Sequence, residues 1–213
     1  MNKKKIILIG AGGNADVIVS TINDINKNKQ SFDIIGLLDD KIQNEKVLGK
    51  ITIKNIDKFK KFKDLFFIWT LRSINLGFNI IKKYNSFNLS RNKLITIKHP
   101  TSVVSDSAKI GNGVSIQPFV NIGPNVVIGD NVHIFSQAMI GHNTKLENFS
   151  YIANNSSIGA FVKIKEGAYI GMNSTIKERI NIEKWSIVGM GSVVTKNVKK
   201  KNIVIGNPAK KLK

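Results

Sequence analysis

Residues 110–134, IGNGVSIQPFVNIGPNVVIGDNVHI, place an isoleucine at every sixth position. An aliphatic residue recurs at the same spacing from Val104 to Val194 without a break. The residue directly after each aliphatic residue is often glycine, and the fourth residue after it is small or β-branched. A fixed period held over this length indicates an internal structural repeat.

Six residues are enough for one short strand and one bend. The large aliphatic residue points inward, while glycine or asparagine accepts the unusual backbone angles of the bend. Three such strands close a triangular coil, and successive coils stack about 4.8 Å apart through main-chain hydrogen bonds. One coil cannot bury its own core, so only the stack is stable. The repeat therefore predicts a left-handed parallel β-helix over residues 99–213, with about five uninterrupted coils.

The first half of the chain has a different pattern, in which short apolar runs alternate with segments of helical spacing. This alternation predicts a small, Rossmann-like parallel α/β domain at residues 1–98. Residues 94–104, LITIKHPTSVV, join the two halves. The expected strands are 4–10, 32–40, 65–71 and a short one within 47–62, and the expected helices are 10–26, a basic one ending at 62, and 73–85.

Composition limits the classes of function. The formal net charge is +19, and the basic residues are nearly all lysine, scattered apart from 199–201 and 210–213. No nucleic-acid-binding motif accompanies them, so we expect a solvated basic surface or patches for phosphorylated ligands. The absence of cysteine excludes disulfides and thiolate metal sites and is typical of an intracellular protein. The apolar run 6–9 is too short for an export signal or a membrane span, and we expect a cytoplasmic protein.

A glycine turn, residues 10–13, follows the first expected strand and resembles the start of the dinucleotide fingerprint, with Ala15 at its third glycine. The unit is too short for a whole dinucleotide. The turn is open to three interpretations: a nucleotide or phosphate cradle at a helix N-terminus, a structural turn, or a NAD-type cofactor site. Asp39 and Asp40, after the second strand, are either acceptors for a base or sugar or solvated turn residues. The substrate-binding candidates are Gly12, Gly13, Asn14, Asp39, Asp40 and Arg72.

Several segments together resemble bacterial sugar acyltransferases of the sialic acid O-acetyltransferase (NeuD)/PglD type, a hexapeptide-repeat family. They are IILIGAGGNADVI (6–18), GLLDD (36–40), KHPTSVVSDSAKIGNGVSI (98–116), IGHNTKLENFSYIA (140–153), IVGMGSVVTKNV (187–198) and IGNPAKKLK (205–213). The resemblance spans nearly the whole chain. It implies an acetyl-CoA-dependent homotrimer with active sites between neighbouring solenoids, and an N-terminal domain that holds a nucleotide-activated amino sugar.

The same resemblance implies that His142, in the I-G-H segment, is the general base. An imidazole that titrates near neutrality is suited to take a proton from an attacking nucleophile. The alternative for His142 is a solvated corner residue. His133 is expected to be structural or part of a ligand wall, and His99 to be structural. The chemistry requires no metal, and the sequence offers no ligand cluster.

The chain departs from the family pattern at three positions. Asn143 stands where an acidic residue usually follows the base, so it can orient the imidazole but adds no charge. Tyr151 replaces a second histidine near the acetyl-CoA, and Asn14 replaces a histidine after the glycine turn. With Asn143 as the second catalytic candidate, the cofactor-binding candidates are Tyr151, Ala160, Met172, Met190, Gly191 and Lys196.

The leading hypothesis is therefore N-acetylation of the amine of a nucleotide-linked deoxy amino sugar. One alternative is O-acetylation of a sialic acid or another saccharide hydroxyl. The alternative from another class is a non-catalytic scaffold that binds nucleotide sugars.

Overall fold

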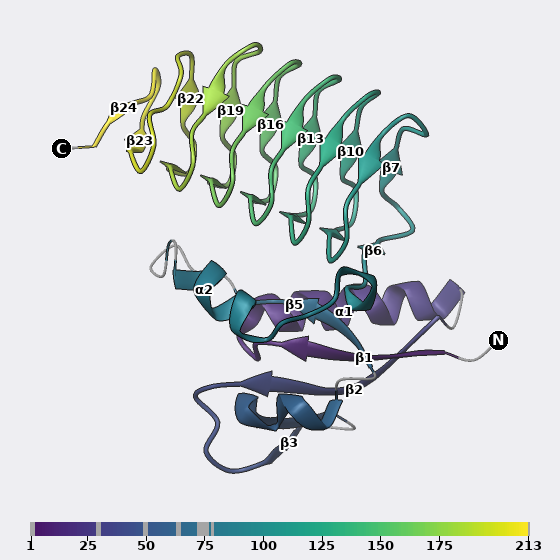
Figure 1. Ribbon diagram of the computed structural model, residues 1–213. Helices are drawn as coiled ribbons and strands as arrows, with labels where there is room; N and C mark the ends of the chain where they lie inside the picture. Colours follow the sequence, from purple (N-terminus) through teal and green to yellow (C-terminus); the bar gives the residue numbers. More distant parts are fainter. Residues whose placement is uncertain are drawn as a thin grey trace. The chain divides into compact units, whose positions relative to one another are not determined.

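The computed structural model describes residues 3–28, 31–48, 51–62, 65–71, 77 and 79–212. The chain divides into two compact units, residues 1–97 and 98–213. Figure 1 shows their contrast, with helices and longer strands in the first and a ladder of very short strands in the second.

The N-terminal unit is built on a five-stranded sheet with the order β3-β4-β2-β1-β5. Strands β4, β2, β1 and β5 are parallel, as the alternating pattern predicts, whereas β3 pairs antiparallel with β4. The strands are β1 (Lys4–Ile9), β2 (Phe32–Asp39), β3 (Lys46–Leu48), β4 (Ile51–Asn55) and β5 (Phe66–Trp69). The helices are α1 (Gly13–Asn28), α2 (Asn79–Ser86) and the 3₁₀ segments η1 (Ile56–Phe62) and η2 (Arg91–Lys93).

Segment 47–62 differs from the expectation of one strand and a basic α-helix. It contributes to the β3–β4 hairpin and then forms the 3₁₀ helix η1. Its apolar residues Ile56, Phe59 and Phe62 are spaced by three, and positions i and i+3 eclipse one another in a 3₁₀ helix. Ile56 and Phe59 are thereby buried on the same side.

The core of the N-terminal unit forms where α1 packs on the sheet. Ala15, Ile18 and Ile22 recur at helical spacing and are fully buried, and they pack with Ile6 and Leu8 of β1. This spacing puts the apolar stripe of α1 on one side. The glycine turn consequently lies at the carboxyl end of β1, where α1 begins.

The second unit confirms the predicted left-handed β-helix of hexapeptide repeats. Strands of two residues stack in parallel with partners eighteen positions apart, as in Asn121 with Met139 and Tyr151 with Tyr169. Three sheets result, and the strands of the first run side by side along the solenoid in Figure 1. The first sheet contains β7 (Val103–Val104), β10 (Asn121–Ile122), β13 (Met139–Ile140), β16 (Ser157–Ile158), β19 (Thr175–Ile176) and β22 (Val193–Val194).

The other two solenoid sheets complete the triangle. The second contains β8 (Lys109–Ile110), β11 (Val127–Ile128), β14 (Lys145–Leu146), β17 (Lys163–Ile164) and β20 (Asn181–Ile182). The third contains β6 (Ile97–Lys98), β9 (Ser115–Ile116), β12 (His133–Ile134), β15 (Tyr151–Ile152), β18 (Tyr169–Ile170), β21 (Ile187–Val188), β23 (Ile203–Ile205) and β24 (Lys210–Lys211). We call the bend after a first-sheet strand the first corner, the bend after a second-sheet strand the second corner, and the bend after a third-sheet strand the third corner.

The inward residues of the solenoid strands form its core. The isoleucines from 116 to 182 in the repeat are at most 3% exposed. Many bends use a residue with positive φ, including Asn125, Asn131 and Asn143, which the repeat anticipated. Aromatic residues also occupy such positions, at Phe119, Phe149, Phe161 and Trp185. The left-handed conformation costs an ordinary L-residue about 1–2 kcal/mol, so these aromatic bends depend on the packed coils for support.

Candidate functional site

The glycine turn is hydrogen-bonded to the ends of β2 and β5, the strands on either side of β1. The N–H of Ala11 donates to Asp39 Oδ2 over 2.8 Å, and Asn14 Nδ2 donates to the carbonyl of Thr70 over 2.8 Å. Gly10 has a φ of 112°, and a Cβ there would lie 2.7 Å from Thr70 Oγ1. Glycine is therefore required at the first position of the turn by both backbone angle and space.

The remaining glycines of the turn face open space. A Cβ added to Gly12 or Gly13 would have no neighbour within 4 Å. Both residues are exposed where α1 begins, and the first N–H groups of a helix have no intrahelical acceptor. Asn14 Oδ1 is buried and makes no hydrogen bond within the described part of the chain. The turn thus offers backbone amide donors at the carboxyl edge of the sheet.

The two aspartates after β2 have different partners. Asp39 accepts the N–H of Lys41 at Oδ1 as well as that of Ala11 at Oδ2, so it orders the glycine turn. Asp40 forms an ion pair with Lys83 of α2. The hydrogen bond from the Lys83 ammonium holds the pKa of Asp40 below its usual value. Arg72, the last substrate-binding candidate, lies outside the described residues.

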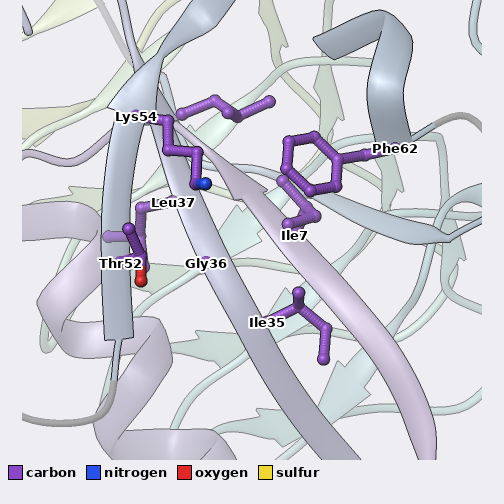
Figure 2. A pocket seen from close by; sticks show the side chains of 8 residues that line it. Ile7, Ile35, Gly36, Leu37, Thr52, Lys54 and Phe62 are labelled. Atoms are coloured by element: carbon purple, nitrogen blue, oxygen red, sulfur yellow. The ribbon is translucent and has the colours of Figure 1, made fainter. Parts of the chain in front are cut away.

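A cavity of about 130 Å³ in the N-terminal unit lies beside β1, β2 and β4, away from the candidate residues (Figure 2). Figure 2 shows Phe62 of η1 on one side of it and Lys54 of β4 on another. A second cavity of about 150 Å³ shares these two residues and is also lined by Gln43 and Asn55. Among the described candidates, Gly12, Gly13, Asn14, Asp39 and Asp40 do not line either cavity.

His142 lies at the first corner, directly after β13. It is exposed, whereas His99 and His133 are 7% and 4% exposed. His142 Nδ1 lies 2.9 Å from Asn143 Oδ1. An amide oxygen only accepts, so Nδ1 carries a proton in this arrangement, and in the neutral ring the lone pair is then on Nε2. Asn143 has a φ of 57°, a conformation that asparagine adopts more readily than most residues.

The two buried histidines are held by hydroxyl groups. His133 Nδ1 lies 2.8 Å from Ser115 Oγ, and His99 Nδ1 lies 2.8 Å from Thr101 Oγ1. His133 and Tyr151 are register partners in the third sheet. Among the three histidines of the chain, His142 alone can receive a proton from a ligand at the surface.

Phe161 and Arg179 also lie at the first corner, and the sequence did not single them out. The rings of Phe161 and His142 are 5.1 Å apart and nearly perpendicular, and the guanidinium carbon of Arg179 lies 4.3 Å from the centre of the Phe161 ring. The signal that could have identified them is the eighteen-residue register, which stacks Asn143, Phe161 and Arg179 in one column.

The structure divides the cofactor-binding candidates between two corners. Ala160 and Lys196 share the first corner with His142, while Met172, Met190 and Gly191 belong to the third corner. The first solenoid sheet separates these corners by one side of the triangle, at most about 20 Å at 3.3 Å per residue. Tyr151 is in the third sheet, 8% exposed and packed on Phe135 and Tyr169. A single chain therefore does not bring these residues to His142.

The outward residues of the first solenoid sheet carry no charge, although the chain is strongly basic. They are Val103, Asn121, Met139, Ser157, Thr175 and Val193. Val103 is 63% exposed and Met139 is 50% exposed. The corresponding row of the second sheet includes Lys109, Lys145 and Lys163. The sheet between the two candidate corners is thus uncharged and partly apolar.

Comparisons with known proteins agree with this architecture. The family model described as the GMPPB C-terminal domain matches residues 96–204, just over half of the chain. The chain belongs to the GMPPB C-terminal domain family. The model of the PglD N-terminal domain matches residues 5–70. This second match supports the resemblance of the N-terminal unit to the PglD type.

Solved structures share the fold of this family member over almost its whole length. Perosamine N-acetyltransferase from Caulobacter crescentus, solved with CoA and GDP-perosamine, is 23% identical, with a TM-score of 0.86 and coverage of 98% of this chain and 97% of that one. The acetyltransferase domain of PglB from Neisseria gonorrhoeae is 22% identical, with a TM-score of 0.85 and coverage of 99% and 100%. WeeI from Acinetobacter baumannii is 22% identical, with a TM-score of 0.81 and the same coverage. No protein with curated annotation matches the sequence significantly.

Within the described ranges, no group of three or more histidine, aspartate or glutamate side chains could hold a metal ion. None of the helices in those ranges is long and apolar enough to cross a membrane.

Proposed function

We propose that this chain is an acetyl-CoA-dependent N-acetyltransferase that acts on the amine of a nucleotide-linked deoxy amino sugar. The observation that carries the proposal is the arrangement of His142, an exposed imidazole whose Nδ1 is engaged by Asn143 and whose Nε2 is left as a base. The shared fold with the Caulobacter crescentus perosamine N-acetyltransferase, which binds CoA and GDP-perosamine, supports this choice of reaction.

The proposed reaction is one acyl transfer. The sugar amine attacks the thioester carbonyl of acetyl-CoA, and His142 Nε2 takes a proton from the nitrogen as the new C–N bond forms. The C–S bond then breaks, and the CoA sulfur leaves and receives a proton from the imidazolium. Asn143 Oδ1 accepts the Nδ1 hydrogen throughout, so it keeps the ring oriented with Nε2 toward the amine.

The N-terminal unit is proposed to hold the nucleotide portion of the amino-sugar substrate. Ligands of parallel α/β sheets bind beyond the carboxyl ends of the strands, which is where Gly12, Gly13 and Asn14 lie. Helix N-terminal amides favour the charge of a diphosphate. Asp39 accepts two backbone N–H groups and retains acceptor capacity for a hydroxyl of the ribose or sugar.

A second copy of the chain is proposed to complete the site, in a homotrimer. Within one chain the first solenoid sheet separates His142 and Lys196 from Met172 and Met190. Packing of uncharged first sheets beside one another would bring the first corner of one copy near the third corner of the next. Acetyl-CoA would then lie between copies, with Lys196 available to its phosphates. Tyr151 is buried within one chain, so it would contact the cofactor only if the cofactor lay against the third sheet.

The proposed location of this reaction is the cytoplasm. The chain contains no cysteine, and disulfide-free proteins are typical of reducing compartments. Fractionation of cells that express the full chain with a C-terminal tag would test this, and recovery of the protein outside the cytoplasm would contradict it.

The activity is tested with acetyl-CoA and a panel of UDP-, GDP- and TDP-linked amino sugars, by following free thiol. At least one sugar should release CoA faster than a protein-free control. The acetylated product should resist mild alkaline hydroxylamine, because an amide survives a treatment that removes an O-acetyl ester. An alkali-labile product would instead favour acetylation of a hydroxyl, and binding without turnover would favour a scaffold.

His142→Ala should reduce turnover by about 100-fold or more, in line with the contribution of general bases. Solution mass is measured on the same samples, against the 23.6 kDa of one chain. Near-full activity in a variant of unchanged mass would remove His142 from the mechanism.

A further inference from the structure

Phe161 occupies the coil next to that of His142 at the first corner. Its N–H donates to the carbonyl of His142 over 3.0 Å, so the two backbones are directly linked. The two rings are 5.1 Å apart with an interplanar angle of 81°. This is the edge-to-face geometry that aromatic pairs prefer.

Arg179 lies one coil further along the same corner. Its N–H donates to the carbonyl of Ala160 over 2.9 Å, and its guanidinium carbon is 4.3 Å from the centre of the Phe161 ring. A guanidinium over an aromatic face is attracted by the ring quadrupole. Phe161 is therefore held between an arginine from one neighbouring coil and a histidine from the other.

We propose that Phe161 is a positioning residue that holds the imidazole of His142 in one orientation, and that Arg179 holds Phe161 in place. This inference rests on the proposed role of His142 as the general base. An exposed histidine has two rotatable bonds, and the hydrogen bond to Asn143 Oδ1 restrains the imidazole only at Nδ1. The edge-to-face contact with Phe161 adds a second restraint, which limits rotation about that hydrogen bond.

The restraint matters because a general base must lie within hydrogen-bonding distance of the proton that it takes. Displacement of a catalytic group by about 1 Å can lower the rate by about 100-fold. Loss of the ring should consequently lower kcat while leaving substrate binding intact.

Phe161→Asn removes the ring with little risk to the fold. Phe161 has a φ of 59°, and Asn125 and Asn143 occupy the same column with a φ of 57°. Asparagine adopts this conformation more readily than phenylalanine, so the variant should retain its melting temperature and its solution mass. Phe149→Asn is the matched control, because Phe149 has a φ of 58° at the second corner and Asn131 has a φ of 54° one coil below it.

The first measurement is the NMR spectrum of the histidine rings in the full-length protein. The chain has three histidines, and the His142→Ala variant assigns the signals of His142. Phe161→Asn should displace the His142 ring signals by removing the ring current of Phe161. Arg179→Gln should displace them by a smaller amount, and Phe149→Asn should leave them in place.

The second measurement is steady-state kinetics of the same variants. Phe161→Asn should lower kcat by about tenfold or more, with the KM values for both substrates unchanged. Phe161→Tyr, which retains the ring, should restore most of kcat. Phe149→Asn should have the kcat of the parent protein.

Unchanged His142 signals in Phe161→Asn would overturn the proposal, because the ring contact would then be absent in solution. Displaced signals with full kcat would also overturn it, because the contact would then have no positioning role. If the parent protein acetylates no sugar in the panel, the proposed function fails separately. The His142 signals then decide alone whether Phe161 holds the imidazole.

Discussion

Replacement of Gly141 by alanine tests how closely the coils constrain the residue before His142. A Cβ at Gly141 would lie 2.7 Å from Ala160 N and 2.7 Å from the carbonyl carbon of Gly159, whereas ordinary contact begins at 3.4 Å. Both atoms belong to the backbone of the next coil and cannot rotate away. The two coils would have to separate, and this strains the hydrogen bond from Gly141 N–H to the carbonyl of Ile158, now 2.8 Å long.

Forcing extra atoms into a packed interior costs about 1–3 kcal/mol. For a protein of this size that range lowers the melting temperature by about 2–12 °C. The comparison variant is Gly189→Ala, which also follows a strand directly but lies at the third corner, where the nearest atom is a methyl carbon of the Ile205 side chain at 2.6 Å. A side-chain methyl group can shift more readily than backbone atoms of a neighbouring coil, so Gly189→Ala should melt at a higher temperature than Gly141→Ala.

Thermal unfolding monitored by circular dichroism would measure the difference, alongside CoA release. Because both variants exchange glycine for alanine, their unfolded states change alike, and the difference reports the clash. Gly141→Ala should also lose activity, since the strain falls on the segment that carries His142. Equal melting temperatures for the two variants would refute the reasoning.

Two more predictions concern charge. Burial alone would raise the pKa of Glu147, but hydrogen bonds from Lys165 and the N–H of Glu166 outweigh it and lower that pKa, and the same bond raises the pKa of Lys165. The contribution of the Glu147 carboxylate is complete above the pKa of the unfolded state and is lost as the pH falls through the lower pKa of the folded state. The stability advantage of the parent over Lys165→Met, about 0.5–1 kcal/mol, should therefore disappear in urea titrations as the pH falls below the ordinary glutamate value of 4.5. Met139→Lys should dissociate the proposed trimer in light scattering, while Val127→Lys, in the lysine-bearing row of the second sheet, should not; a trimeric Met139→Lys protein would contradict the first sheet as the contact surface.

The six-residue repeat made the solenoid predictable from the sequence. The aliphatic residue of each hexapeptide, such as Ile140, must point inward, and a coil of eighteen residues must return the chain to the same sheet. The pairing of His133 with Tyr151, eighteen residues apart, was therefore predictable. The parallel α/β sheet was predictable for a similar reason, because periodicity reports burial. The β3–β4 hairpin and η1 were not, since short segments with mixed spacing depend on tertiary packing.

The candidate site was less accessible to prediction. The family resemblance pointed to His142, and the structure places it at an exposed corner beside Asn143. The contacts of Phe161 with His142 and Arg179 depend on side-chain directions, which the register does not specify. The engagement of Asp39 by the Ala11 N–H depends on how a turn and a strand end meet. Such contacts join residues from different elements, and no local pattern encodes them.

The register of the solenoid, with partners eighteen residues apart, also restricts how this chain can change length during evolution. Deletion of six residues ahead of His142 would turn every later coil by one side of the triangle and move the histidine to another corner. Deletion or duplication of eighteen residues would shift it along the axis and keep it at the first corner. Homologues of different length should therefore differ by whole coils within the repeat, with other insertions confined to bends, where they leave the phase of the later strands intact.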